Sequence, residues 1–208
     1  MRTLVLVRRD ARVSDNTALY NASRRSDGGV VCLAVCSPGD WARHSDAPVK
    51  IDLWLRCLAE MGASLAALNI PLLVRTAPTP GDIPGLVVAT ARAAGADAVF
   101  FNAEYEVDEA RRDAEIAAAC GRGGLRLESF HDQTVLPPGA VATQQGGPYS
   151  VFTPFKRAWT AEVQRRGGVA PLPTAARQLR AALPSDTVPE LRAFGLIHAV
   201  DPSLWPAG

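Results

Sequence analysis

Short apolar runs alternate with segments of helical periodicity along the first 130 residues of the chain. The five runs span residues 3–7, 29–36, 71–76, 98–102 and 125–130. They are continuous rather than alternating, as expected for strands that are covered on both faces of a parallel sheet. The segments between them place apolar residues on one side of a helix, and the stripe in 49–68 consists of Ile51, Leu55, Leu58, Met61 and Leu65. The pattern predicts an α/β fold, a doubly wound, Rossmann-like sheet of five parallel strands with helices on both faces.

The pattern changes after residue 130. Residues 131–150 contain prolines and glycines but no helical period, and one helix is predicted to start at Thr153, with Pro154 in the first helical position. Beyond that helix the sequence is interrupted by prolines at positions 171, 173, 184, 189, 202 and 206. Short helices separated by prolines form no core of their own. We therefore expect an α/β domain over 1–130 and, over 131–208, a connecting loop, a helix and an inter-domain linker.

The segment GGPYSVFTPFKRAW is rich in aromatic residues, although these make up only 6% of the chain. Phe155, Trp159 and Val163 follow one another at four-residue steps, which predicts a helix whose apolar stripe packs on neighbouring elements. Lys156 lies near the positive end of this helix, an unfavourable place for a cation unless an anion or an acidic surface faces it. We predict a domain junction formed by Tyr149, Phe152, Phe155, Lys156 and Trp159.

Composition narrows the class of protein. With 208 residues, 48% of them apolar and 21% charged, the chain is an ordinary globular protein. Its formal net charge of +1 argues against a basic surface over the whole molecule. No apolar stretch reaches the roughly 20 residues of a membrane helix, and the N-terminal run has no cleavage signal, so we expect a cytoplasmic protein without membrane contact. The four cysteines show no CxxC pair and no histidine at ligand spacing, which favours buried, reduced thiols over a metal site.

Polar residues that directly follow the predicted strands are candidates for ligand binding. In an open doubly wound sheet, ligands bind beyond the carboxyl ends of the strands, near the reversal of strand order. The residues in these positions are Arg8, Arg9, Asp10, Ser37, Gly39, Asn102, Glu104, Glu106, His131 and Asp132. No GxGxxG, P-loop or GxSxG motif accompanies them. Taken alone, the residues after the first strand also fit a solvated loop in which Asp15 or Asn16 caps a helix. The acidic residues after the fourth strand also fit the first turn of a helix, where the macrodipole favours them.

Three segments together resemble the N-terminal α/β domain of the DNA photolyase/cryptochrome family. The first is the turn after the first strand, with Arg9, Asp10, Arg12, Asp15 and Asn16. The second follows the fourth strand, with Asn102, Tyr105, Glu106, Arg112 and Asp113. The third runs from Pro148 to Phe155. They occur in the order and spacing of the family, and the resemblance covers essentially the whole chain.

The resemblance implies a light-dependent enzyme that repairs pyrimidine dimers in DNA with FAD, and an N-terminal domain that holds a light-harvesting antenna, either a folate (methenyltetrahydrofolate) or a deazaflavin. In folate-binding members a carboxylate after the Tyr-Glu pair contacts the pterin, and Glu109 matches it, whereas Asp108 stands where such members often have Asn. In deazaflavin-binding members the chromophore lies near Arg9, Cys36, Ser37 and Asn102. The run YEVDE favours folate slightly. The antenna-binding residues implied are Arg9, Cys36, Ser37, Asn102, Glu104, Asp108 and Glu109.

The resemblance also implies that the FAD-binding helical domain begins about where this sequence ends. We therefore expect no catalytic residue in the chain, no repair by the chain alone, and contact with FAD and damaged DNA only through that C-terminal domain. Two alternatives stay open, a free-standing nucleotide- or pterin-binding α/β module and part of a cryptochrome photoreceptor. A fragment should expose Phe152, Phe155 or Trp205 and aggregate or form a homodimer through its linker, whereas a self-sufficient module should have its tail folded back.

Overall fold

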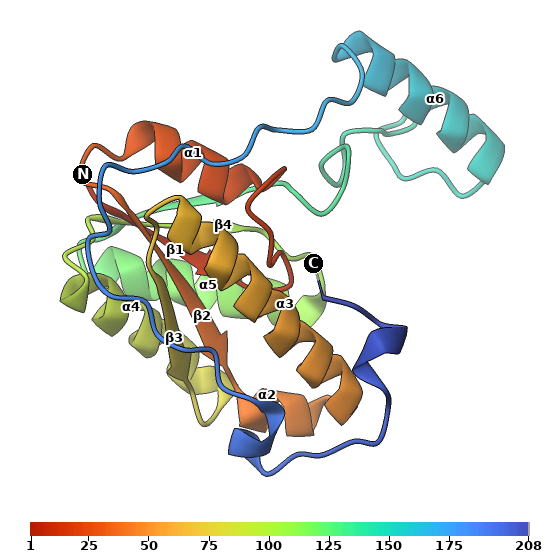
Figure 1. The fold of residues 1–208 in the computed structure, drawn as a ribbon. Helices are drawn as coiled ribbons and strands as arrows, with labels where there is room; N and C mark the ends of the chain where they lie inside the picture. Colours follow the sequence, from red (N-terminus) through yellow and green to blue (C-terminus); the bar gives the residue numbers. More distant parts are fainter. Residues whose placement is uncertain (208) are drawn as a thin grey trace.

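The computed structural model describes residues 1–207 and contains a five-stranded sheet (Figure 1). Its strands are β1 (Thr3–Val7), β2 (Val30–Cys36), β3 (Leu72–Thr76), β4 (Ala98–Asn102) and β5 (Arg126–Phe130). They pair in parallel in the order β3-β2-β1-β4-β5. The predicted sheet is confirmed, and each strand begins and ends within one residue of its predicted range.

Helices cover both faces of the sheet (Figure 1). On one face lie α1 (Thr17–Arg25) and α3 (Pro48–Ala67), and on the other lie α4 (Ile83–Ala93) and α5 (Val107–Arg122). The short α2 (Pro38–Arg43) precedes α3, and α6 (Phe152–Arg165) follows the long connection after β5. The remaining helical turns are η1 (Pro80–Asp82), η2 (Leu191–Phe194) and η3 (Pro202–Leu204). Over residues 1–207, no helix combines the length and the apolar character needed to cross a membrane.

Two hydrophobic cores follow from the alternation of side chains along the central strand β1. Val5 and Val7 pack with residues of α1 and α3, whereas Leu4 and Leu6 pack with residues of α4 and α5. The whole apolar stripe predicted for α3 is buried. Because both faces are covered, β1 and β4 are buried along their entire length, which accounts for the continuous apolar runs in the sequence.

The segment after α6 returns to the α/β body and runs across it. Leu172 is hydrogen-bonded to Asp15 through both its N–H and its carbonyl group. Further on, the Asp186 N–H donates to the carbonyl of Leu72, and the Asp186 carboxylate accepts from the N–H of Val74, each at 2.8 Å. These bonds occupy the outer edge of β3, whose backbone groups would otherwise be unpaired.

Gln178 fixes this tail at the start of β2. Its Oε1 accepts from the Val30 N–H at 2.7 Å, and its Nε2 donates to the carbonyls of Val30 at 2.9 Å and Asn69 at 3.2 Å. Gly29 adjoins the amide with a φ of 91°, and a Cβ at this position would lie 2.4 Å from Gln178 Oε1. The contact therefore requires glycine at position 29, both for its backbone conformation and for space.

The N-cap of helix α6 lies two residues before the predicted cap, Thr153. Val151 is the N-cap residue, with extended backbone and no side-chain hydrogen bond, so Pro154 is the third helical residue rather than the first. The first turn tolerates proline at this position because the N–H there has no partner within the helix. The predicted packing of its apolar stripe is also wrong for residues 1–207, since α6 has no buried residue and stands away from the sheet (Figure 1).

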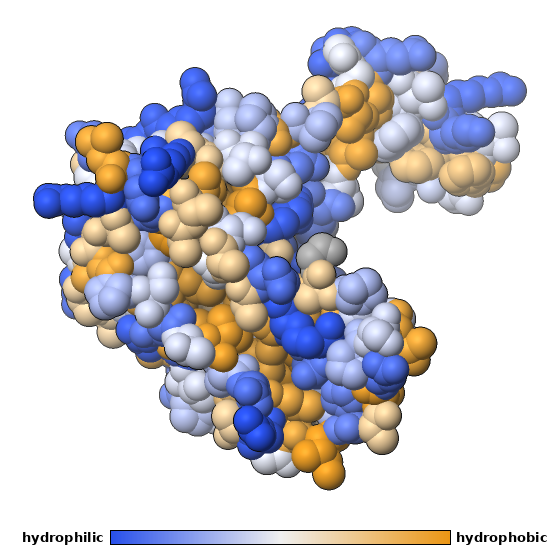
Figure 2. Space-filling model, in the orientation of Figure 1, coloured by the Kyte–Doolittle hydropathy of each residue, from blue (hydrophilic) through white to orange (hydrophobic). Residues whose placement is uncertain are grey.

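Aromatic side chains are consequently exposed on α6. Phe152 is 72% exposed and Phe155 36%, and the Phe155 ring meets that of Tyr149 at 6.2 Å between centroids. Figure 2 shows apolar side chains on the surface of the projecting part of the molecule that contains α6. Trp205 is 51% exposed. The structure thus combines the exposed aromatic residues expected of a fragment with the folded-back tail expected of a self-sufficient module.

We predict that Gln178→Ala lowers the free energy of unfolding by about 2 kcal/mol, because backbone groups of Val30 and Asn69 lose their partners. Urea denaturation followed by circular dichroism measures the change. The matched control is Arg177→Ala, which alters an exposed neighbour on the same segment and should leave stability unchanged. Equal stability of the two variants would show that the hydrogen bonds of Gln178 do not stabilise the domain.

Candidate functional site

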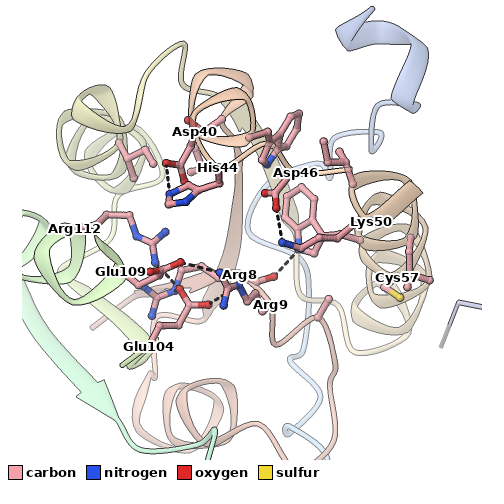
Figure 3. Close-up of a pocket in the computed structure, with 18 of the residues that line it drawn as sticks. Arg8, Arg9, Asp40, His44, Asp46, Lys50, Cys57, Glu104, Glu109 and Arg112 are labelled. Carbon is pink, nitrogen blue, oxygen red and sulfur yellow. Dashed lines mark hydrogen bonds and ion pairs between the residues drawn. The ribbon is translucent and has the colours of Figure 1, made fainter. Parts of the chain in front are cut away.

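A cavity of about 690 Å³ lies at the carboxyl ends of β1 and β2, beside the segment that follows β4 (Figure 3). Strand β1 lies between β2 and β4, where the strand order reverses. Ligands of open α/β sheets bind at this position. The loops after β1 and β2, together with the first turns of α3 and α5, supply most of the lining. We call this space the strand-end cavity.

Paired charges form one side of the strand-end cavity. Arg8, the first residue after β1, lies 3.5 Å from Glu104 and forms a close ion pair with Asp113. Arg112 forms a second close ion pair with Glu104. The four side chains are between 5% and 17% exposed. Each of these buried charges faces a group of opposite charge, so the cluster is a fixed electrostatic framework. We call it the charged floor.

Arg9 extends the charged floor toward solvent. Its two terminal nitrogens each donate to a carboxylate at 2.7 Å, one to Glu106 and the other to Glu109. Partial burial by itself lowers the pKa of the Arg9 guanidinium, but the surrounding carboxylates, with Glu104 and Glu109 foremost, raise it above its ordinary value. Arg9 is therefore a permanent cation, and it holds the Glu109 carboxylate inside the cavity.

Two tryptophans supply the aromatic part of the lining. Trp41 of α2 and Trp54 of α3 meet edge to face, with 6.3 Å between ring centroids and 68° between ring planes. Trp54 Nε1 donates to the carbonyl of Arg8 at 2.6 Å, which ties this ring to the charged floor. Flat apolar groups beside fixed charges suit a planar heteroaromatic ligand, which stacks through its faces and hydrogen-bonds through its edges.

Ser37 is a buried polar residue of the cavity that has no partner. It lines the cavity and is 4% exposed, yet its hydroxyl makes no hydrogen bond to any group of residues 1–207. The Nε of Arg112, in the same lining, is also unpaired among those residues. An unpaired buried polar group costs about 1–3 kcal/mol. Such groups call for a bound water, ion or ligand that completes the hydrogen bonding.

Further ion pairs lie around the cavity. Lys50 pairs with Asp46 at the start of α3. Arg43 donates to Asp40 at 3.0 Å and lies 3.5 Å from Asp108. The contact between Arg43 and Asp108 links α2 to the first turn of α5, but both side chains are partly exposed, so this link is weak.

Four of the seven antenna-binding residues implied by the sequence line the strand-end cavity, namely Arg9, Ser37, Glu104 and Glu109. Cys36 is fully buried in the core beside Ile51 and Leu55. Asp108 pairs with Arg111 and Arg43 and is not part of the lining. The third residue outside this cavity, Asn102, is engaged elsewhere.

Asn102 connects the end of β4 to the loop after β1. Its Oδ1 accepts from the Ala18 N–H at 2.9 Å, and its Nδ2 donates to Asp10 at 2.6 Å and to Asn16 at 2.9 Å. Asn16 in turn caps α1 by accepting from the Leu19 N–H at 3.0 Å, as one of the two predicted caps. With both its carbonyl and its amide group used in this way, Asn102 holds the loop and α1 in place.

The structure adds lining residues that were not predicted as site residues, among them Trp41, His44, Asp46, Lys50, Trp54, Cys57 and Arg112. For Trp54 a signal exists, because it lies three residues after Ile51, on the border of the predicted apolar stripe near the start of the helix. For α2 there is no local signal, because this six-residue helix buries none of its residues.

Other candidate residues lie outside the cavity. The predicted junction residues belong to α6 or precede it (Figure 1), and they are Tyr149, Phe152, Phe155, Lys156 and Trp159. Asp132 accepts from the N–H of Thr17 at 2.9 Å, and His131 Nδ1 lies 2.9 Å from the Tyr105 hydroxyl. Among residues 1–207, no three His, Cys, Asp or Glu side chains are grouped so as to hold a metal ion.

Comparison with known proteins identifies the family. The family model for DNA photolyase matches residues 3–177. The chain belongs to the DNA photolyase family. The deoxyribodipyrimidine photo-lyases of Vibrio cholerae and Escherichia coli are 42% and 38% identical to it over 159 residues, which is 75% of this chain and 33% of each relative. That of Neurospora crassa is 31% identical over 217 residues, 96% of this chain and 35% of the relative. The chain thus spans about a third of the length of the curated relatives it matches.

Solved structures of photolyases share the fold. A class III photolyase from Agrobacterium tumefaciens matches with a TM-score of 0.73 at 24% identity, over 95% of this chain and 39% of that one. A photolyase from Sulfolobus tokodaii matches with a TM-score of 0.75 at 20% identity, over 100% of this chain and 44% of that one. The latter structure holds two FAD molecules and is described as implying a novel light-harvesting cofactor. At these identities the likeness confirms the predicted fold alone.

We predict that iodoacetamide alkylates Cys57, which lines the strand-end cavity, but not Cys32, Cys36 or Cys120 in the folded photolyase-family chain. Burial raises the pKa of the Cys36 thiol to about 12 and also raises that of Cys120, so neither forms the reactive thiolate near pH 8. Mass spectrometry of the digested protein identifies the labelled site. Cys57→Ser should remove the label, and labelling of Cys36 in the folded protein would contradict the arrangement described.

Proposed function

We propose that this chain is the light-harvesting, antenna-binding part of a deoxyribodipyrimidine photo-lyase whose full-length form repairs ultraviolet-induced pyrimidine dimers with light and FAD. Membership of the family and the names of the relatives support the proposal. Because the chain spans about a third of those relatives, we assign FAD, damaged DNA and repair to the C-terminal helical domain of such a protein. Light-dependent loss of dimers with the isolated chain would contradict this assignment.

The strand-end cavity is the observation that carries the proposal. Its volume of about 690 Å³ falls within the range of small-molecule sites, about 300–1,000 Å³. It offers two indole rings, a charged floor and the unpaired hydroxyl of Ser37. A planar chromophore with hydrogen-bonding groups along its edges has the complementary chemistry.

The position of Glu109 bears on the class of chromophore. This residue is the one on which the folate interpretation depends, yet its carboxylate is 13% exposed and bound to Arg9 within the strand-end cavity. Asp108, its neighbour, is engaged with Arg43 and Arg111. We therefore propose that the antenna is a tricyclic flavin or deazaflavin in the strand-end cavity, rather than the folate that the YEVDE run favours.

One observation favours the alternative of a free-standing binding module. The tail folds back on the α/β domain through Gln178 and Asp186, and so it stabilises the domain without any other partner. Both hypotheses require the same cavity and the same class of ligand. They differ in whether the exposed aromatic face of α6 meets a helical domain, and a cryptochrome-type output would leave this chain unchanged.

The proposal predicts that 5-deazariboflavin or FMN binds the purified chain more tightly than methenyltetrahydrofolate in equilibrium dialysis. Ser37→Ala should weaken binding about fivefold, the equivalent of one hydrogen bond of about 1 kcal/mol. The matched control is Ser14→Ala, an exposed serine of the loop after β1 that is not part of the lining.

Location is tested separately, because a ligand in the cavity should slow the alkylation of Cys57. Tight binding of the folate alone, lost in Glu109→Ala, would contradict the proposed chromophore class. Absence of binding by all three compounds would contradict the antenna function itself.

A further inference from the structure

The turn formed by residues 188–198 packs against the tryptophans that line the strand-end cavity. At its centre lies η2, in which Leu191 and Phe194 are three residues apart. Side chains at this spacing project in the same direction from a 3-10 helix. Leu191 is 7% exposed and packs with Ile51 and Leu55 of α3, while Phe194 packs beside Trp41 of α2. Figure 1 shows this blue turn of the tail beside α2.

A continuous series of contacts leads from Phe194 to the charged floor. The Phe194 ring meets that of Trp41 edge to face, with 5.0 Å between centroids and 86° between planes. Trp41 meets Trp54 in the same manner at 6.3 Å, and Trp54 donates to the carbonyl of Arg8 at 2.6 Å. Phe194 therefore supports the Trp41 ring directly and the Trp54 ring only through Trp41.

Helix α2 is held by few contacts, among them the hydrogen bond from the Gly39 N–H to the Pro78 carbonyl at 3.1 Å and the partly exposed ion pair of Arg43 with Asp108. It is six residues long, none of its residues is buried, and its N-cap residue Ser37 makes no side-chain capping bond. A helix this short is not stable by itself in water. The orientation of Trp41 therefore depends on packing against residues outside α2, and Phe194 supplies one such aromatic contact.

Anchors on both sides of η2 keep Phe194 in register. Upstream, Asp186 binds the edge of β3 through its main chain and its carboxylate. Downstream, His198 Nε2 lies 3.4 Å from Asp52 of α3. Gly195, with a φ of 71°, ends η2 in the left-handed region that favours glycine and turns the chain back toward α3. The segment is thus a strap fastened at both ends across α2 and α3.

We propose that Phe194 is a positioning residue of the chromophore site, and that the strap of residues 188–198 is a structural component of the strand-end cavity. The inference rests on the proposed function. It extends the site past residue 177, the last residue that the family model matches. Because coupling between two sites is reciprocal, a chromophore whose binding depends on the position of Trp41 also stabilises the strap.

The test measures binding of 5-deazariboflavin by equilibrium dialysis to the full 208-residue chain and to Phe194→Ala. The variant should bind about three- to tenfold more weakly, the range that corresponds to one lost aromatic contact. Phe194→Tyr, which keeps the ring, should restore the affinity. Ile197→Ala, which alters an exposed residue of the same strap, should bind as the unaltered protein does.

Hydrogen exchange provides a readout that a general loss of stability would not produce. In Phe194→Ala the amides of α2 should exchange faster, while those of the central strands keep their protection. In the unaltered protein, the ligand should slow exchange over residues 190–196. If Phe194→Ala fails to fold, Phe194→Leu replaces it in the same assays, because leucine keeps an apolar contact but lacks the aromatic ring.

Two results would overturn the inference in distinguishable ways. Unchanged affinity of folded Phe194→Ala, together with lost affinity in Trp41→Ala, would leave the proposed function standing and show that the strap does not contribute. Absence of binding by the unaltered protein would remove the proposed function, and the role of Phe194 with it.

Discussion

The buried pairing of Arg8 with Glu104 and Asp113 is the interaction on which the arrangement of the site depends. Each of these side chains is at most 13% exposed, and removal of one partner from such a cluster typically costs about 3–5 kcal/mol, because it leaves an unpaired buried charge. The cluster joins the loop after β1 to α5 beyond β4, across the reversal of strand order. It also sets the place of the Arg8 carbonyl, which holds the indole of Trp54. The ion pairs of this cluster therefore determine where the lining of the cavity lies.

The strand-end cavity is built from two kinds of constraint. The charged floor is local to the sheet, because Arg8 and Glu104 directly follow β1 and β4. The aromatic wall is not local, because Trp41 lies on a short helix that is packed against Phe194, more than 150 residues away in the sequence. The proposed light-harvesting function is served best by a chromophore that is held at a defined distance and orientation. The charged floor and the aromatic wall would supply both constraints.

The sheet was predictable because strands covered on both faces have continuous apolar runs, and the stripe of α3 because a helix against a sheet repeats its apolar residues. The start of α6 was not, since local preference favours Thr153 as the N-cap, whereas the helix begins after Val151, which makes no side-chain capping bond. Asn102 was assigned to a ligand because a polar residue after a strand serves a ligand or a loop equally well in sequence. The inward orientation of Glu109 depends on Arg9, about 100 residues away, and the wall of the cavity depends on the tail. Such long-range contacts leave no local pattern.

The most direct measurement of the central claim is a crystal structure of this chain with 5-deazariboflavin. The account predicts that the tricyclic ring lies between the tryptophans and the charged floor, with an edge atom within hydrogen-bonding distance of the Ser37 hydroxyl, and that η2 remains packed on Trp41. A ring bound instead on the exposed aromatic face of α6, with the strand-end cavity filled only by water, would contradict the account.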